Sequence, residues 1–126
     1  MKRVGPLVPM LLAAVALTGA GQSSENPFAG DVAAIEEGRA LMGAVCGGYC
    51  HATEGEATDA PDLFDCEWWH DDTDTGLFGV IRDGVPNTRM QGFGGILADD
   101  GIWRLVTVIR ADSRCEEGDR AAPDPR

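Results

Sequence analysis

The run from Cys46 to His51 constrains this chain more than any other feature of its sequence. Two cysteines are separated by three residues and the second is followed at once by a histidine, in the order Cys46-Gly47-Gly48-Tyr49-Cys50-His51. The related pattern Cys-x-x-Cys-His is typical of covalent haem attachment, in which two thiols bond the haem and the histidine is held against the iron. Here the spacing is one residue longer. Attachment through both Cys46 and Cys50, or through Cys50 alone, is therefore open.

The first 20 residues have the pattern of an export signal. Lys2 and Arg3 precede an apolar stretch over residues 7–17, and small residues follow at 18–20. That stretch is too short to span a bilayer, and this order of basic, apolar and small segments is typical of a secretory signal peptide. We therefore expect a periplasmic protein from which residues 1–20 are removed. Membrane attachment is expected only through a partner or through an uncleaved signal segment.

The chain is strongly acidic. It carries 21 acidic and 10 basic side chains, and loss of Lys2 and Arg3 leaves 8 basic side chains against 21 acidic ones, a net charge of −13. Such a charge disfavours binding to nucleic acids and anionic membranes, because both bind basic surfaces. It either steers a cationic partner toward the protein or serves solubility alone, and the sequence leaves both interpretations open.

The rest of the chain reads as one domain. Hydrophobic residues make up 44% of the 126 residues, which permits a packed core. We place the domain at residues 31–115, between a flexible lead at 21–30 and a disordered tail at 116–126. The sequence shows no paired strand segments and no internal repeat, so we expect an all-α fold.

Three helices are expected within this domain. The first begins after Asp31, which can cap its free amides, and runs to residue 45. Gly38 inside this helix suggests close approach by another element. The second is expected to be capped by Asp74 or Thr75. The third covers residues 99–110, where apolar residues form a strong stripe at helical spacing.

Five segments in a consistent order resemble the monohaem class I cytochromes c. The resemblance extends over residues 31–110 and rests on the segments 38–42, 46–51, 60–63, 84–90 and 102–110. The loop around Met90 and the last helix are similar in particular to the small periplasmic cytochromes that accept electrons from quinoprotein dehydrogenases.

The resemblance implies a cytochrome c fold, with three or more helices around one covalently bound haem c. Cys46 and Cys50 would then form the thioether bonds. His51 and Met90 would be the axial ligands of the iron, and Met/His ligation raises the reduction potential. The carbonyl of Pro61 would accept a hydrogen bond from the second ring nitrogen of His51 and so orient the ring.

Two cysteines, Cys66 and Cys115, remain outside this motif. An exported protein meets oxidising conditions, so we expect them to form a disulfide; two buried thiols are the alternative. Two interpretations without haem also stay open. A structural zinc site would use Cys46, Cys50, Cys66 and His70, whose spacings fit. A disulfide-stapled binding module would pair Cys46 with Cys50 and Cys66 with Cys115.

The function implied by the resemblance is electron transport rather than catalysis. Met90 as second ligand would close the iron position that peroxide or small-ligand chemistry needs. His70 is the rival for that position, although two aspartates follow it and favour an exposed side chain. The expected partners are periplasmic redox proteins: a donor dehydrogenase, and an oxidase or another cytochrome as acceptor.

Overall fold

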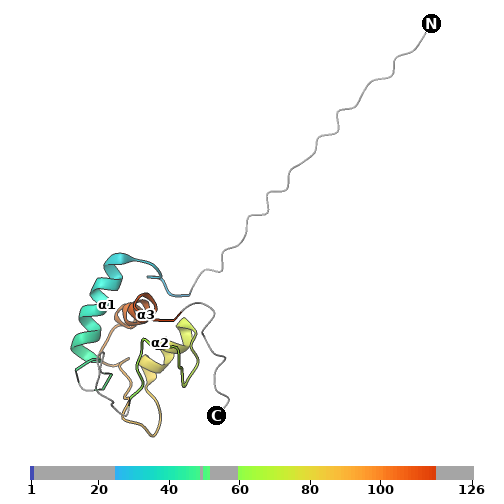
Figure 1. Ribbon diagram of the computed structural model, residues 1–126. Coiled ribbons are helices and arrows are strands. Elements are labelled where there is room, and N and C mark those ends of the chain that lie inside the picture. Colours follow the sequence, from blue (N-terminus) through green and yellow to red (C-terminus); the bar gives the residue numbers. More distant parts are fainter. Residues whose placement is uncertain (2–24, 49, 52–59, 116–126) are drawn as a thin grey trace.

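Three α-helices form the framework of the molecule (Figure 1). The computed structural model describes residues 1, 25–48, 50, 51 and 60–115. The helices are α1 (Val32–Val45), α2 (Asp74–Asp83) and α3 (Asp99–Ala111). Within the described residues the only β-type pairing is an isolated bridge between Gly84 and Gln91, so the predicted all-α class is confirmed. None of the helices in this part of the chain has the length and apolarity needed to cross a membrane. Residues 2–20 of the predicted signal peptide and the predicted tail lie outside the described residues.

Helix α3 is the centre of the core, because it packs against both α1 and α2 (Figure 1). Its side chains at Ile102, Leu105 and Val106 are fully buried. Apolar residues at this spacing cover a broad helix face, which here is wide enough to serve two neighbours. Asp99 and Asp100 stand in the first turn, where negative charge suits the positive end of the helix dipole.

Helices α1 and α3 cross closely at Gly38. A Cβ atom on Gly38 would lie 2.4 Å from the carbonyl oxygen of Arg104 and 3.2 Å from Cβ of Val108. The close approach predicted at Gly38 is thus confirmed, and only glycine fits there. On the other side of α3, Trp103 stacks on Phe78 of α2 with ring centroids 4.3 Å apart.

The cap of helix α2 lies one residue before the first of its two predicted caps. The cap is Thr73, whose hydroxyl oxygen accepts a hydrogen bond from the backbone N–H of Gly76 at 3.0 Å. The prediction of Asp74 or Thr75 is wrong, because Asp74 is already the first helical residue while Thr73 has the extended backbone of a cap. The helix ends at Gly84, which has a positive φ of 75° that favours glycine.

Asn26 and Phe28, which belong to the predicted flexible lead at 21–30, both contact α3. The side chain of Asn26 is buried and donates a hydrogen bond to the hydroxyl of Thr107 at 3.0 Å. The guanidinium of Arg104 lies 4.4 Å from the ring centroid of Phe28. A buried amide with a satisfied partner holds this segment in place, which composition alone does not reveal.

The loop of residues 62–74 joins the cavity region to α2, and we call it the tryptophan loop because it contains Trp68 and Trp69. Its C-terminal end is attached to α3 through Arg110. The Nε atom of Arg110 lies 2.7 Å from a carboxylate oxygen of Asp74, and its second nitrogen donates to the carbonyl of Asp72. The same guanidinium lies 6.0 Å from the ring centroid of Trp68.

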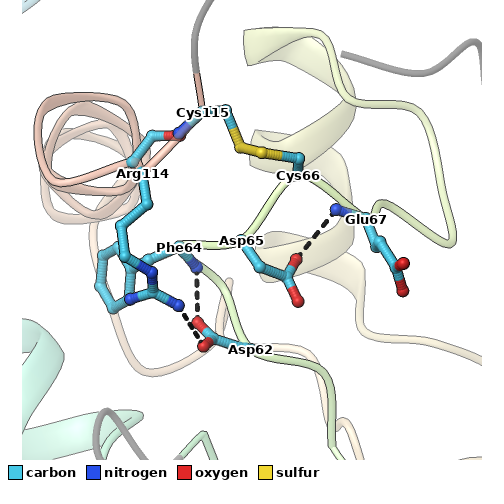
Figure 2. The surroundings of a disulfide bond; sticks show 8 residues. Asp62, Phe64, Asp65, Cys66, Glu67, Arg114 and Cys115 are labelled. Atoms are coloured by element: carbon cyan, nitrogen blue, oxygen red, sulfur yellow. Dashed lines mark hydrogen bonds and ion pairs between the residues drawn. A yellow bond between two sulfur atoms is a disulfide. The ribbon is translucent and has the colours of Figure 1, made fainter. Parts of the chain in front are cut away.

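The N-terminal half of the tryptophan loop is attached to the chain beyond the end of α3 (Figure 2). Cys66 and Cys115 are joined by a disulfide, with Cα atoms 5.3 Å apart. Arg114 forms an ion pair with Asp62. Partial burial favours the neutral form of Asp62, but hydrogen bonds from the N–H of Phe64 and from Arg114 prevail and lower the pKa of this carboxyl. The loop is therefore fixed to one end of α3 at several points.

Removal of this disulfide is expected to destabilise the protein strongly. The bond joins residues 49 positions apart, and the chain-entropy model assigns a loop of that length on the order of 4 kcal/mol. We expect the Cys66→Ser/Cys115→Ser double variant to unfold at a clearly lower urea concentration than the natural protein without reductant. A thiol reductant should abolish most of that difference. Equal unfolding midpoints under oxidising conditions would contradict the expectation.

Candidate functional site

A cavity of about 400 Å³ opens beside the three helices, and side chains from all of them line it. Its walls are mainly apolar and include Met42 of α1, Leu77 and Ile81 of α2, and Leu105 and Ile109 of α3. Pockets of about 300–1,000 Å³ with apolar walls and a few polar groups are typical of small-molecule and cofactor sites. The cavity therefore has the size and lining of a cofactor site.

The turn after α1 brings both motif cysteines and the histidine to this cavity. Cys46, Cys50 and His51 all line it. The N–H of Cys46 donates to the carbonyl of Met42, and the N–H of His51 donates to the carbonyl of Cys46 at 3.0 Å. This second hydrogen bond closes the turn. Both cysteines remain on the cavity wall although their spacing is one residue longer than in the usual motif.

The two motif cysteines carry thiols rather than a disulfide. Burial, and then the neighbouring Cys50 thiol, raise the pKa of Cys46 to about 11. Because a buried thiolate lacks solvation, Cys46 stays a neutral thiol at neutral pH. The disulfide-stapled alternative, in which Cys46 pairs with Cys50, is not what the structure contains.

The ring of His51 is oriented by Pro61. Nδ1 of His51 lies 2.8 Å from the carbonyl oxygen of Pro61. A carbonyl is only an acceptor, so Nδ1 is the donor in this contact, and Nε2 is the nitrogen with the lone pair in the neutral ring. Metal-binding histidines are oriented in this way by a second partner, which also raises the basicity of the ligating nitrogen. The contact implied by the resemblance is present in the structure.

Met90 lies on a loop that is closed on itself. The N–H of Val85 donates to the carbonyl of Met90 at 2.9 Å. Inside the loop, the Thr88 hydroxyl donates to the carbonyl of Val85 at 2.8 Å and accepts from the N–H of Met90 at 3.1 Å. Asn87 has a positive φ of 62°, which asparagine tolerates better than most residues. The loop thus presents Met90 to the cavity in a defined conformation.

The end of the Met90 loop is held against the C-terminal part of α2. The N–H of Phe93 donates to the carbonyl of Ile81, and the N–H of Gly94 donates to the carbonyl of Arg82, both at 2.9 Å. A Cβ atom on Gly92 would lie 2.7 Å from the carbonyl oxygen of Arg82. Glycine at this position therefore lets the loop reach α2.

The zinc alternative is not supported by the structure. Cys66, one of its four ligands, is bonded to Cys115 and has no thiolate to offer. Among the described residues, no group of three or more His, Cys, Asp or Glu side chains could hold a metal ion. His70, the rival iron ligand, is exposed as expected, although it also lines the cavity.

Fold and cavity together define the class of the protein: it is a c-type cytochrome. The family model described as "Cytochrome C oxidase, cbb3-type, subunit III" matches residues 33–108, which is more than half of the chain, and the protein belongs to that family. Members of this class carry electrons on covalently bound haem c, and the same holds for this chain. No curated protein sequence is significantly similar to it.

A solved structure with a similar fold is the crystal structure of cytochrome CL from the marine methylotrophic bacterium Methylophaga aminisulfidivorans. The two structures agree with a TM-score of 0.63 at 21% sequence identity, over 83% of this chain and 77% of the other. At this identity the likeness supports the cytochrome c fold.

The residues present fit a covalently bound haem. Two cysteines, a histidine whose Nδ1 faces a carbonyl oxygen, and a methionine line a cavity whose walls are otherwise largely apolar. Sequence reasoning did not find Thr88, whose hydroxyl ties the Met90 loop together. An asparagine followed by a threonine, in a segment rich in glycine and proline, was the available signal for such a turn.

Proposed function

We propose that the protein is a periplasmic single-haem carrier that takes electrons from a quinoprotein dehydrogenase and passes them to an oxidase or another cytochrome. The observation that carries the proposal is the cavity that Cys46, Cys50, His51 and Met90 all line. The likeness of the fold to cytochrome CL supports the class of carrier. The choice of donor rests on the similarity of the Met90 loop and the last helix to dehydrogenase-linked cytochromes.

Each site residue has a defined part in this proposal. Cys46 and Cys50 would hold the haem by thioether bonds, and His51 and Met90 would bind its iron. When bound, the group would supply one-electron redox chemistry. The hydrogen bond that Nδ1–H of His51 donates to the carbonyl of Pro61 leaves Nε2 available for the iron. The thioether of Met90 favours ferrous iron and so raises the reduction potential.

The surroundings of the site also raise the reduction potential. Apolar side chains such as Leu105 and Ile109 line the cavity and keep water away from it. Low polarity disfavours the additional positive charge of the oxidised state and raises the potential further. The Cys66–Cys115 disulfide suits the oxidising periplasm in which we place the protein.

Electron transfer from a quinoprotein dehydrogenase tests the proposed donor. The oxidised protein is mixed with a purified quinoprotein alcohol dehydrogenase and its alcohol, and reduction is followed by visible absorption. We expect reduction that requires both enzyme and alcohol, and that slows as salt rises if the charge of −13 steers association. No reduction under any salt condition, by a protein that a chemical reductant does reduce, would contradict this donor class.

Thr88→Val is expected to loosen Met90 without removing it. The substitution deletes a hydroxyl that makes two hydrogen bonds within the Met90 loop, each contributing about 1 kcal/mol. We expect a lower free energy of unfolding. In the oxidised protein, a smaller share of the molecules should have the Met90 sulfur bound to iron, and the sulfur-to-iron absorption should be weaker. Thr88→Ser keeps the hydroxyl and is the matched control. Identical spectra and stability for Thr88→Val and the natural protein would contradict the role assigned to this hydroxyl.

A further inference from the structure

An exposed tryptophan stands at the cavity. Trp69 is 61% exposed and yet lines the cavity. Two other large apolar side chains of the described chain, Val32 and Ile96, are similarly exposed, at 70% and 67%, but neither lines the cavity. Tryptophan is enriched among the residues that dominate protein interfaces, because it combines a large apolar area with few rotatable bonds. Trp69 is therefore the candidate contact residue beside the redox site.

The tryptophan loop, which carries Trp69, is attached to the rest of the molecule at several points. Its ends are attached to α3 and the chain beyond it by the Cys66–Cys115 disulfide and by the ion pair of Arg110 with Asp74. The Arg114–Asp62 ion pair adds a third attachment. Ordering a mobile loop upon docking costs free energy, and a loop that is already ordered avoids that cost.

The charge around Trp69 indicates which kind of partner fits. Glu67 is exposed and also lines the cavity, and Asp71 is exposed two residues after Trp69. Hydrogen bonds from the backbone and side chain of Thr73 lower the pKa of Asp71, so this carboxylate is charged at neutral pH. Arg89 on the Met90 loop also lines the cavity. The acidic character thus belongs to the tryptophan loop, and a complementary partner has basic groups facing it.

We propose that Trp69 is the contact residue at which a redox partner docks, and that this partner presents an apolar or aromatic surface flanked by basic groups. The inference rests on the proposed function as an electron carrier and adds the docking residue and the chemistry of the partner surface. Trp69 supplies the apolar contact, and the neighbouring carboxylates attract the partner from a distance.

Two small oxidants of opposite character test this surface on the complete haem-loaded protein. Tris(phenanthroline)cobalt(III) is an aromatic cation, whereas ferricyanide is a polar anion. In either reaction the reduced protein gives up one electron, which converts Co(III) to Co(II) or ferricyanide to ferrocyanide. Stopped-flow rates at low salt are compared for the natural protein, Trp69→Ala, Trp69→Phe and the control Ile96→Ala, whose side chain is similarly exposed but does not line the cavity.

We expect Trp69→Ala to slow oxidation by the cobalt complex by about threefold to tenfold, as truncation of a dominant interface residue does. Trp69→Phe should recover most of the rate, Ile96→Ala should leave it unchanged, and ferricyanide should respond little to any of them. Glu67→Gln should slow the cobalt reaction at low salt more than Glu36→Gln on α1. Equal cobalt rates for Trp69→Ala and Ile96→Ala would overturn the proposal.

The reduction potential of each variant separates this inference from the proposed function. An unchanged spectrum and potential in Trp69→Ala, together with a slower cobalt reaction, support docking at Trp69. A shifted potential that accounts for the rate change would instead assign Trp69 to the wall of the haem site and overturn the docking role. A natural protein without any haem spectrum would contradict the proposed function as an electron carrier.

Discussion

Replacing Met90 with alanine is expected to lower the reduction potential of the protein by on the order of 0.2 V, within the roughly 0.8 V range that axial ligands set. The thioether favours ferrous iron, so its loss stabilises the oxidised state relative to the reduced one. The oxidised variant should also lose its sulfur-to-iron charge-transfer absorption. Spectroelectrochemical titration measures the potential and the absorption in one sample.

Met42 provides a matched control for this experiment. It is buried, lines the same cavity and belongs to α1 rather than to the Met90 loop. Met42→Leu conserves volume, so it is expected to be tolerated and to leave the potential and the charge-transfer absorption in place. Loss of that absorption in Met42→Leu and its retention in Met90→Ala would show that Met42, and not Met90, is the iron ligand.

Gly38→Ala is expected to destabilise the fold by about 3 kcal/mol, at the upper end of what overpacking costs. The added Cβ would meet a backbone carbonyl oxygen of Arg104 at 2.4 Å, and backbone atoms move less readily than the end of a side chain. The two helices would have to separate at their crossing. Because α1 leads directly into the turn with Cys46 and His51, we also expect the variant to lose the native haem spectrum at a lower temperature than the natural protein.

Gly43→Ala is the control on the same helix. A Cβ atom at Gly43 would meet nothing within 4 Å, and the residue is exposed. Alanine favours the helical state over glycine by up to about 1 kcal/mol, so this variant should be slightly more stable than the natural protein. Urea unfolding of both variants provides the comparison. A Gly38→Ala variant as stable as Gly43→Ala would mean that α1 and α3 do not cross as closely as described.

The three helices could be predicted because their signals are local. Asp31 caps α1, and the apolar stripe of α3 becomes the buried centre of the core. The cap of α2 was misplaced because three consecutive residues, Thr73, Asp74 and Thr75, are all suited to capping, and the choice among them depends on the backbone of the preceding loop.

The arrangement of the helices was only partly predictable. Gly38 indicated a close approach, and the structure shows one. Periodicity defines which face of a helix is apolar but leaves the rotation of the opposite helix undetermined. It therefore did not indicate that Arg104 and Val108 would face Gly38.

The residues of the candidate site could be predicted from the sequence more fully than the contacts that hold the tryptophan loop in place. Cys46, Cys50, His51, Pro61 and Met90 were all proposed from the sequence, and all line one cavity. The attachments of the tryptophan loop were not foreseen, apart from the disulfide. Arg110 and Asp74 are 36 positions apart in the sequence, and an ion pair between residues so far apart along the chain produces no local sequence pattern.

The haem itself is the most direct test of the account. The protein is produced in a host that exports it and attaches haem, extracted with acidic acetone, and converted to its pyridine haemochrome. We predict haem that stays with the protein and a band position typical of two thioether bonds, at Cys46 and Cys50. Cys46→Ala should move the band to the position of a single thioether. A natural protein that is exported but colourless would contradict the central claim.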